Sequence, residues 1–280
     1  MSESLLGKVI AAAEALTQTV EQQTSKINQA AAAATKVVRE TIRGYNVESF
    51  FVDAENGDNS NSGKSGNQAW KDLSPLSDLI VFGKTYDIYL RSGQRVIMPK
   101  NIKADNVIIT IKGDYVAPAT LAMAAIDYNG TKDGTVCFDG HNQVLKLYGT
   151  ILETATLPPE STGKSSSYAG SAFQRVHGWG NLSVEIYRGG IDIKDFPLIK
   201  TAKQNSGFIS LNLGASSFIR ISEGGESKLA YSNDHFGLSN GSLSFIDNAH
   251  GSNTWNTILS GVGGNSNVLA DFDFEGQVEA

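Results

Sequence analysis

Apolar side chains in the first 45 residues recur with a seven-residue period. Two interleaved series, offset by three residues, occupy the a and d positions of a heptad, and only Gln23 and Thr41 among them are polar. A heptad pattern sustained over about five repeats predicts a coiled coil. A lone helix lying on the rest of the chain is the alternative. The predicted seam consists of Leu6, Val9, Ala13, Leu16, Val20, Gln23, Ile27, Ala30, Ala34, Val37 and Thr41.

After residue 50 the pattern changes to short runs separated by polar turns. A strand is expected at Phe50–Ala54 and a short helix at Trp70–Leu79, where apolar residues recur every three positions. The later runs lie between Asn-Gly, Gly-Gly and similar turns, which predicts strands. The main expected strands are Tyr86–Leu90, Arg95–Met98, Val107–Gly113, Thr135–Phe138, Val144–Tyr148, Leu182–Tyr187, Gly190–Ile193, Phe208–Leu213, Phe218–Ile221, Lys228–Tyr231, Ser242–Ile246, Thr257–Leu259 and Val268–Phe274.

No helical pattern longer than about ten residues interrupts these strands, which excludes a doubly wound α/β fold and leaves a sandwich, a barrel or a solenoid. A solenoid is favoured because strand and turn alternate to the end of the chain without a boundary. Composition supports the same division: all 6 prolines and 27 of the 29 glycines follow residue 45. We therefore expect a coiled coil at 1–45, an opening segment with a polar loop at 46–85, and a β-domain at 86–280.

Charge and cysteine content exclude several classes of protein. The net charge of −6 argues against a general nucleic-acid binder, which needs clustered Lys and Arg. Cys137 is the single cysteine and lies in an apolar run, so we expect a buried thiol and no disulfide framework. No apolar stretch is long enough for membrane insertion, and the N-terminus lacks the basic region of a secretory signal. Synthesis in the cytosol is the resulting expectation.

The opening of the β-domain carries a family resemblance. Phe51–Gly63 reads FVDAENGDNSNSG, Trp70–Leu73 reads WKDL, Ile88–Gly93 reads IYLRSG, and Ile109–Gly113 reads ITIKG. As a set, these motifs resemble the first turns of right-handed parallel β-helices of the pectate-lyase type, which occur in bacteriophage tail fibres and tailspikes. The resemblance implies a mainly β fold, with the N-terminal coiled coil followed by a β-helix-like domain of about eight turns, assembled as a homotrimer.

The same resemblance implies a function. It suggests a virion structural protein, a phage tail fibre or tail appendage subunit, which is synthesised and assembled in the host cytoplasm and resides in the virion tail. Its partners would be two further copies, other phage tail or baseplate proteins, and a host surface polysaccharide or receptor. The alternative is a tailspike glycan depolymerase, although enzymatic tailspikes are usually much longer. No cofactor is expected.

Candidate sites in the sequence are sparse, and the four histidines have no metal-ligand spacing. Asp271, Asp273 and Glu275 alternate with phenylalanines, which places three carboxylates on one strand face; such acids can cleave a glycosidic bond or bind calcium, or can simply face solvent. Asp192 and Asp195 form a second acidic pair. Aromatic residues among polar turns can stack on sugar rings or belong to a core or subunit interface. The named glycan candidates are Trp179, Tyr231 and Trp255.

Overall fold

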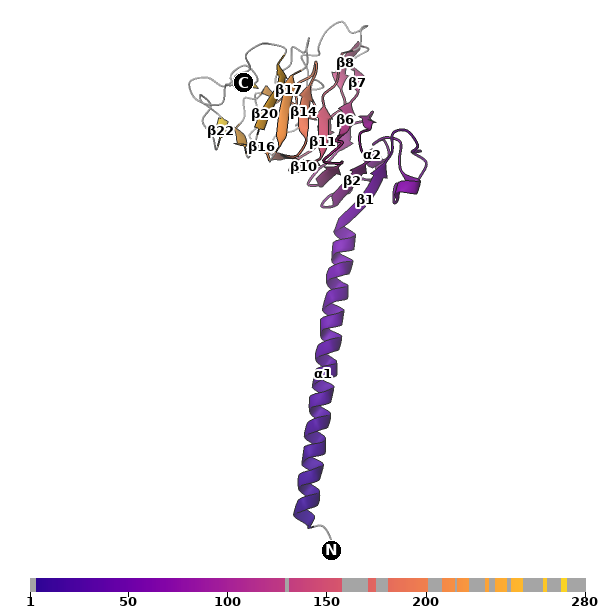
Figure 1. Cartoon of the computed structure of the whole chain (residues 1–280), viewed down its shortest axis with the longest axis vertical. Helices are drawn as coiled ribbons and strands as arrows, with labels where there is room; N and C mark the ends of the chain where they lie inside the picture. The colour runs from indigo at the N-terminus through magenta and orange to yellow at the C-terminus, as the bar shows by residue number, and fades with distance from the viewer. Residues whose placement is uncertain are drawn as a thin grey trace. The chain divides into compact units, whose positions relative to one another are not determined.

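The chain forms two compact units, residues 1–46 and residues 47–280. The computed structural model describes residues 4–128, 131–157, 171–174, 181–200, 208–214, 216–221, 230–231, 235–240, 243–248, 259–260 and 268–270. In this part the protein is mainly β with parallel sheets, preceded by one long N-terminal helix (Figure 1).

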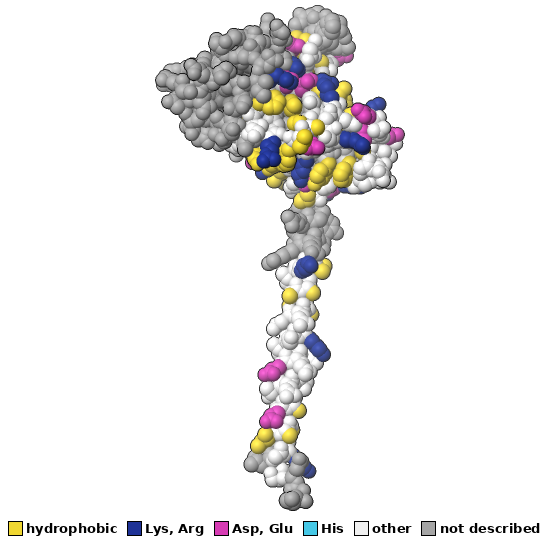
Figure 2. Space-filling model, in the orientation of Figure 1, with side chains coloured by type: hydrophobic (Ala, Val, Ile, Leu, Met, Phe, Trp, Pro, Cys, Tyr) yellow, Lys and Arg dark blue, Asp and Glu magenta, His cyan; other side chains and the backbone are white. Residues whose placement is uncertain are grey.

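The first unit contains helix α1 (Leu5–Asn46), which is 42 residues long and ends one residue beyond the predicted boundary. The hydroxyl of Ser4 caps its start by accepting the Gly7 N–H at 3.2 Å. Apolar side chains along the helix are 51–66% exposed, and Figure 2 shows them as separate hydrophobic spots on a polar rod. The heptad seam is therefore an apolar stripe on the surface of the helix itself, as a coiled coil requires. The exposed set is Val9, Ile10, Leu16, Val20, Ile27, Val37 and Val38.

The second unit consists mainly of three parallel sheets. In the described residues, sheet 1 contains β1 (Val47–Val52), β2 (Thr85–Leu90), β5 (Ile108–Lys112), β10 (Gln143–Tyr148), β13 (Leu182–Tyr187), β16 (Phe208–Leu213), β19 (His235–Asn240) and β22 (Val268–Ala270). Sheet 2 contains β3 (Arg95–Met98), β6 (Ala119–Met123), β11 (Thr150–Glu153), β14 (Gly190–Ile193), β17 (Ser217–Ile221) and β20 (Leu243–Asn248), most of which lie side by side in Figure 1. Sheet 3 contains β4 (Ile102–Lys103), β9 (Phe138–Asp139), β12 (Phe173–Gln174), β15 (Ile199–Lys200), β18 (Ala230–Tyr231) and β21 (Leu259–Ser260).

The chain visits the three sheets in a fixed order, so each strand pairs with the strand one circuit earlier. Equivalent side chains therefore stack in register, and the core consists of such stacks. Each fully buried aliphatic side chain contributes roughly 1.5–3 kcal/mol relative to exposure. One stack in sheet 1, with members 0–1% exposed, is Ile88, Ile111, Leu147, Ile186 and Leu213.

Several predicted strands match the observed ones, including Leu182–Tyr187, Gly190–Ile193 and Phe208–Leu213. The predicted strand Thr135–Phe138 was wrong. Its ends belong to two different strands, β8 (Thr131–Thr135) and β9, because a hairpin is inserted here between sheets 2 and 3. In that hairpin β8 pairs antiparallel with β7 (Ala125–Tyr128). Circuits also vary in length, because neighbouring strands of sheet 1 pair at offsets from 23 to 39 residues.

The opening segment forms the first circuit of the β-domain, between β1 and β2. Within it, the predicted helix at Trp70–Leu79 was mostly wrong. Only α2 (Leu76–Leu79) is helical, after a short 3-10 turn at Gly66–Gln68. Trp70 instead forms a parallel bridge to Val52 and stacks on the buried Phe50 ring, with centroids 4.3 Å apart. The period of three reflects Trp70, Leu73 and Leu76 all reaching the core from an irregular segment.

The polar loop after β1 is organised around one buried carboxylate, Asp53, which is 4% exposed. It accepts the backbone N–H groups of Glu55 and Asn56 at 3.1 and 3.0 Å. The Gln94 amide at 2.9 Å, the Arg91 guanidinium at 2.8 Å and the Asn56 side-chain amide at 3.5 Å also donate to it. Burial alone would raise the pKa of Asp53, but the hydrogen bonds from Asn56, Gln94 and Glu55 outweigh it and lower the pKa to about 2.

This lowered pKa predicts acid-dependent stability. The ionised Asp53 is favoured in the folded state, so its contribution is complete above pH 4 and is lost as the pH falls from about 4 to 2. We expect the wild-type chain to lose on the order of 2 kcal/mol of unfolding free energy over this range through this group. Asp53→Asn should lose less on acidification, measured by urea denaturation at several pH values. Glu55→Gln, in the same loop but at an exposed carboxylate, is the matched control; equal acid sensitivity of all three proteins would contradict the assignment.

Candidate functional site

The outward face of sheet 1 carries a row of aromatic side chains. Strand alternation directs Tyr86, Ile88 and Leu90 inward, so Asp87 and Tyr89 point outward. The register then aligns the outward residues of successive circuits. We call this set the aromatic row; its members in order are Phe51, Tyr89, Lys112, Tyr148 and Tyr187.

Rings in the aromatic row contact one another except where the lysine interrupts them. Phe51 and Tyr89 stack with centroids 5.1 Å apart, and Tyr148 and Tyr187 lie 6.1 Å apart. Tyr115, from the loop after β5, meets the edge of Tyr187 at 6.2 Å and is half exposed. Tyrosines on an open surface can offer an apolar ring face and a hydroxyl group to a ligand.

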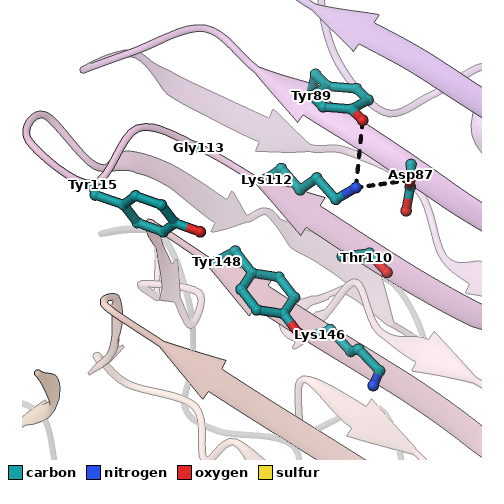
Figure 3. A pocket seen from close by; sticks show the side chains of 8 residues that line it. All are labelled: Asp87, Tyr89, Thr110, Lys112, Gly113, Tyr115, Lys146 and Tyr148. Atoms are coloured by element: carbon teal, nitrogen blue, oxygen red, sulfur yellow. Dashed lines mark hydrogen bonds and ion pairs between the residues drawn. The ribbon is translucent and has the colours of Figure 1, made fainter. Parts of the chain in front are cut away.

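A pocket of about 540 Å³ opens where Lys112 replaces an aromatic residue (Figure 3). Tyr89 and Tyr148 stand two strands apart, a separation of about 9.6 Å. The side chain of Lys112 leans back toward Asp87, with its amino group 2.7 Å from the carboxylate and 5.0 Å from the Tyr89 ring centre. The small Thr110 forms the neighbouring outward position, so the space between the two tyrosines stays open. The lining residues are Asp87, Tyr89, Thr110, Lys112, Gly113, Tyr115, Lys146 and Tyr148.

Both lysines of the pocket are ion-paired. Lys146 lies 2.8 Å from Glu185, and this hydrogen bond raises the pKa of Lys146. Burial would lower the pKa of Lys112, but its hydrogen bonds to Asp87 and Tyr89 outweigh burial and raise it. Each lysine therefore remains cationic at neutral pH, and each charge is balanced by a carboxylate.

The arrangement of side chains in this pocket suits binding of a sugar ring better than hydrolysis of a glycosidic bond. Tyrosine rings offer apolar faces to a pyranose, while the hydroxyl groups of Thr110, Tyr115 and Tyr148 line the same space. Hydrolysis of a glycosidic bond generally uses two carboxyl groups about 5–9.5 Å apart. Asp87 is the one carboxylate among the lining residues, and it is held by Lys112.

Most of the sequence-based glycan and acid candidates are not among the residues that the structure describes. Asp271, Asp273, Glu275, Trp179 and Trp255 fall outside the described residues. For Tyr231 only the backbone is described, in β18 of sheet 3, so its role as a glycan contact is also untested.

The second acidic pair, Asp192 and Asp195, lies in and just after β14, and both carboxylates make structural contacts. Asp192 is 1% exposed and ion-paired with Lys194 at 2.9 Å and with Arg220. The Asp195 carboxylate accepts the Leu157 N–H at 2.8 Å. These contacts hold neighbouring circuits together, as turn-stabilising acids do. Cys137 is buried as expected, and burial raises the pKa of its thiol to about 12.

Sequence reasoning missed the pocket because its residues come from three circuits, at positions 87–89, 110–115 and 146–148. One signal was available: the motifs TYDIYL and QVLKLY both place tyrosine at an outward position of a strand. Without the register between circuits, that signal did not show that the two tyrosines face the same space.

Comparison with known proteins adds no relative: no protein-family model, curated protein or solved structure matches this chain. Within the described residues, no helix combines the length and apolar character needed to cross a bilayer.

Proposed function

We propose that this chain is one subunit of a homotrimeric phage tail fibre or tail appendage that contacts a host surface glycan. The observation that carries the proposal is the exposed heptad seam of α1 joined to a domain of stacked parallel circuits. The coiled coil would assemble the subunits and lead to other tail or baseplate proteins. The β-domain would act as a stiff extension bearing the aromatic row.

For the β-domain we propose a right-handed parallel β-helix. Support comes from the fixed order of the three sheets and from the motifs of the opening segment, which resemble those of this fold. The hand follows from the general rule that crossovers between parallel strands of one sheet are almost always right-handed.

For the helix we propose three strands rather than two. Two-stranded coiled coils usually carry charged residues at the e positions, whereas here those positions are Ile10, Thr17, Thr24, Ala31 and Val38. The hydroxyl groups of Thr17 and Thr24 donate to the carbonyls of Ala13 and Val20, so these threonines can be buried without an unsatisfied donor. The apolar stripe is thus wider than an a/d seam, as contact with two neighbours requires.

Glycan contact is tested at the pocket. Tyr148→Ala removes one wall of the pocket, and we expect at least a tenfold loss of affinity for polysaccharide extracted from the host cell surface. Tyr148→Phe keeps the ring and should retain most of the binding, measured by titration calorimetry. Val116→Ala, at a 93% exposed residue outside the pocket, is the control. Unchanged binding by Tyr148→Ala would exclude this pocket, and no binding by the wild-type protein would favour an adaptor within the tail.

The virion location is tested separately. Antibodies raised against the purified chain should label the tail of particles produced from the phage genome that encodes it, as seen by electron microscopy. Labelling of no part of the particle would contradict the proposal.

A further inference from the structure

The loop between α2 and β2 exposes an unusual run of apolar residues. Leu79, Ile80, Val81 and Phe82 follow one another, and such runs are rare on the surface of a monomeric protein. Ile80 packs against the core, while Leu79, Val81 and Phe82 are 44, 52 and 71% exposed. We call these three exposed residues the apolar tip.

Hydrogen bonds hold the apolar tip in place. The buried Tyr86 hydroxyl accepts the Val81 N–H at 2.7 Å and donates to the Leu79 carbonyl at 3.2 Å. Gly83 turns the chain with a φ of 78° and donates its N–H to the Asn106 carbonyl at 3.1 Å. A loop fixed at both ends in this way presents its side chains outward as a formed surface, ready to bind without ordering first.

The apolar tip lies close to the start of the β-domain. Val47, the residue after the end of α1, pairs with Thr85, three positions beyond Phe82. The next residue, Glu48, is ion-paired with Lys84. One strand spacing plus three residues of chain places the tip within roughly 15 Å of Val47.

We propose that the apolar tip is covered by a second copy of this chain, which continues the subunit interface from the coiled coil into the β-domain. The axes of packed helices lie about 8–10 Å apart. Since Val47 directly follows α1, the Val47 residues of neighbouring subunits would lie at a similar distance from one another. Because each tip lies so near its own Val47, it falls within reach of the neighbouring β-domain. The inference rests on the proposed trimer and names a surface that the heptad pattern does not.

Cysteine accessibility tests this interface in the full-length protein. Phe82→Cys places a thiol on the tip, Val81→Cys is a second reporter, and Val116→Cys is the exposed control. The native Cys137 is buried with a pKa of about 12, so it contributes little background to maleimide labelling. We expect Phe82→Cys to react at least tenfold more slowly than Val116→Cys. Adding the helix changes Leu16→Lys and Ile27→Lys, which should separate the subunits, should restore fast labelling.

The outcomes separate this inference from the trimer itself. If Phe82→Cys and Val81→Cys label as fast as Val116→Cys in a protein that sediments as a trimer, the tip is uncovered and only this inference fails. A wild-type protein that sediments as a monomer overturns the proposed trimer, and the interface with it. Protection that persists in the separated subunits would also overturn the inference, because the cover would then come from the same chain.

Discussion

Replacing Leu16 and Ile27 with lysine is expected to convert the proposed trimer into monomers at micromolar concentration. Both residues lie on the heptad seam, at a d and an a position, and are 65 and 66% exposed in the single chain. In a trimer each substitution places three ammonium groups at the centre of one layer. Burying an unpaired charge costs several kcal/mol, so two such layers exceed what the remaining alanine-rich seam provides. Sedimentation equilibrium measures the loss directly.

The loss of association should also reduce helix content. A 42-residue helix with no partner gains stability from backbone propensity alone, which is marginal in water. Circular dichroism at 222 nm should therefore fall in the variant, while the β-domain keeps its cooperative unfolding transition. The control is Ser25→Lys with Ala32→Lys, which adds the same charge at two f positions on the opposite face. If the control dissociates equally, or if the seam variant stays trimeric, the a and d positions do not form the contact between subunits.

Trp70→Ala is expected to destabilise the β-domain by about 3–5 kcal/mol, the range observed for large aromatic residues in cores. Trp70 is 1% exposed and stacks on Phe50 of β1, in the first circuit of the β-domain. Its indole N–H donates to the Asn61 carbonyl at 3.0 Å, and its backbone bonds to Phe51 and Asp53. One substitution therefore opens a cavity and releases the polar loop.

Urea denaturation of the β-domain transition measures this effect. Trp70→Phe keeps most of the ring but loses the indole donor, so it should cost less, about 1–2 kcal/mol. Val116→Ala, a truncation at a solvent-exposed site, should stay within about 0.5 kcal/mol of wild type. A loss below 1 kcal/mol for Trp70→Ala would show that the opening segment does not close the core.

The tight approach of the loop to Trp70 also explains the last glycine of the segment FVDAENGDNSNSG. Gly63 has a φ of 69°, and a Cβ there would lie 2.5 Å from the indole ring. Both the backbone angle and the contact exclude a larger residue. Glycine at position 63 is therefore a packing requirement of this segment.

Local patterns in the sequence were sufficient for the helix and for many strands. The heptad needs no tertiary information, because positions seven apart lie on the same face of any helix. Strands such as Leu182–Tyr187 were equally clear from alternation and flanking turns. The predicted helix at Trp70–Leu79 failed because a period of three in a short, irregular segment does not distinguish a helix from a loop whose apolar residues reach the core.

The sequence by itself determined that this protein has a long N-terminal helix with a heptad seam followed by a domain of short strands, since both follow from patterns between near neighbours in the chain. The three parallel sheets and the pocket were decided only in the tertiary structure. Asp87, Lys112 and Tyr148 meet because strands β2, β5 and β10 pair in one register. The two circuits that separate them are 23 and 36 residues long, the second being longer because it contains the β7–β8 hairpin, so no fixed period marks the pairing. Register is set by burial of the inward stacks, and this is a property of the whole domain.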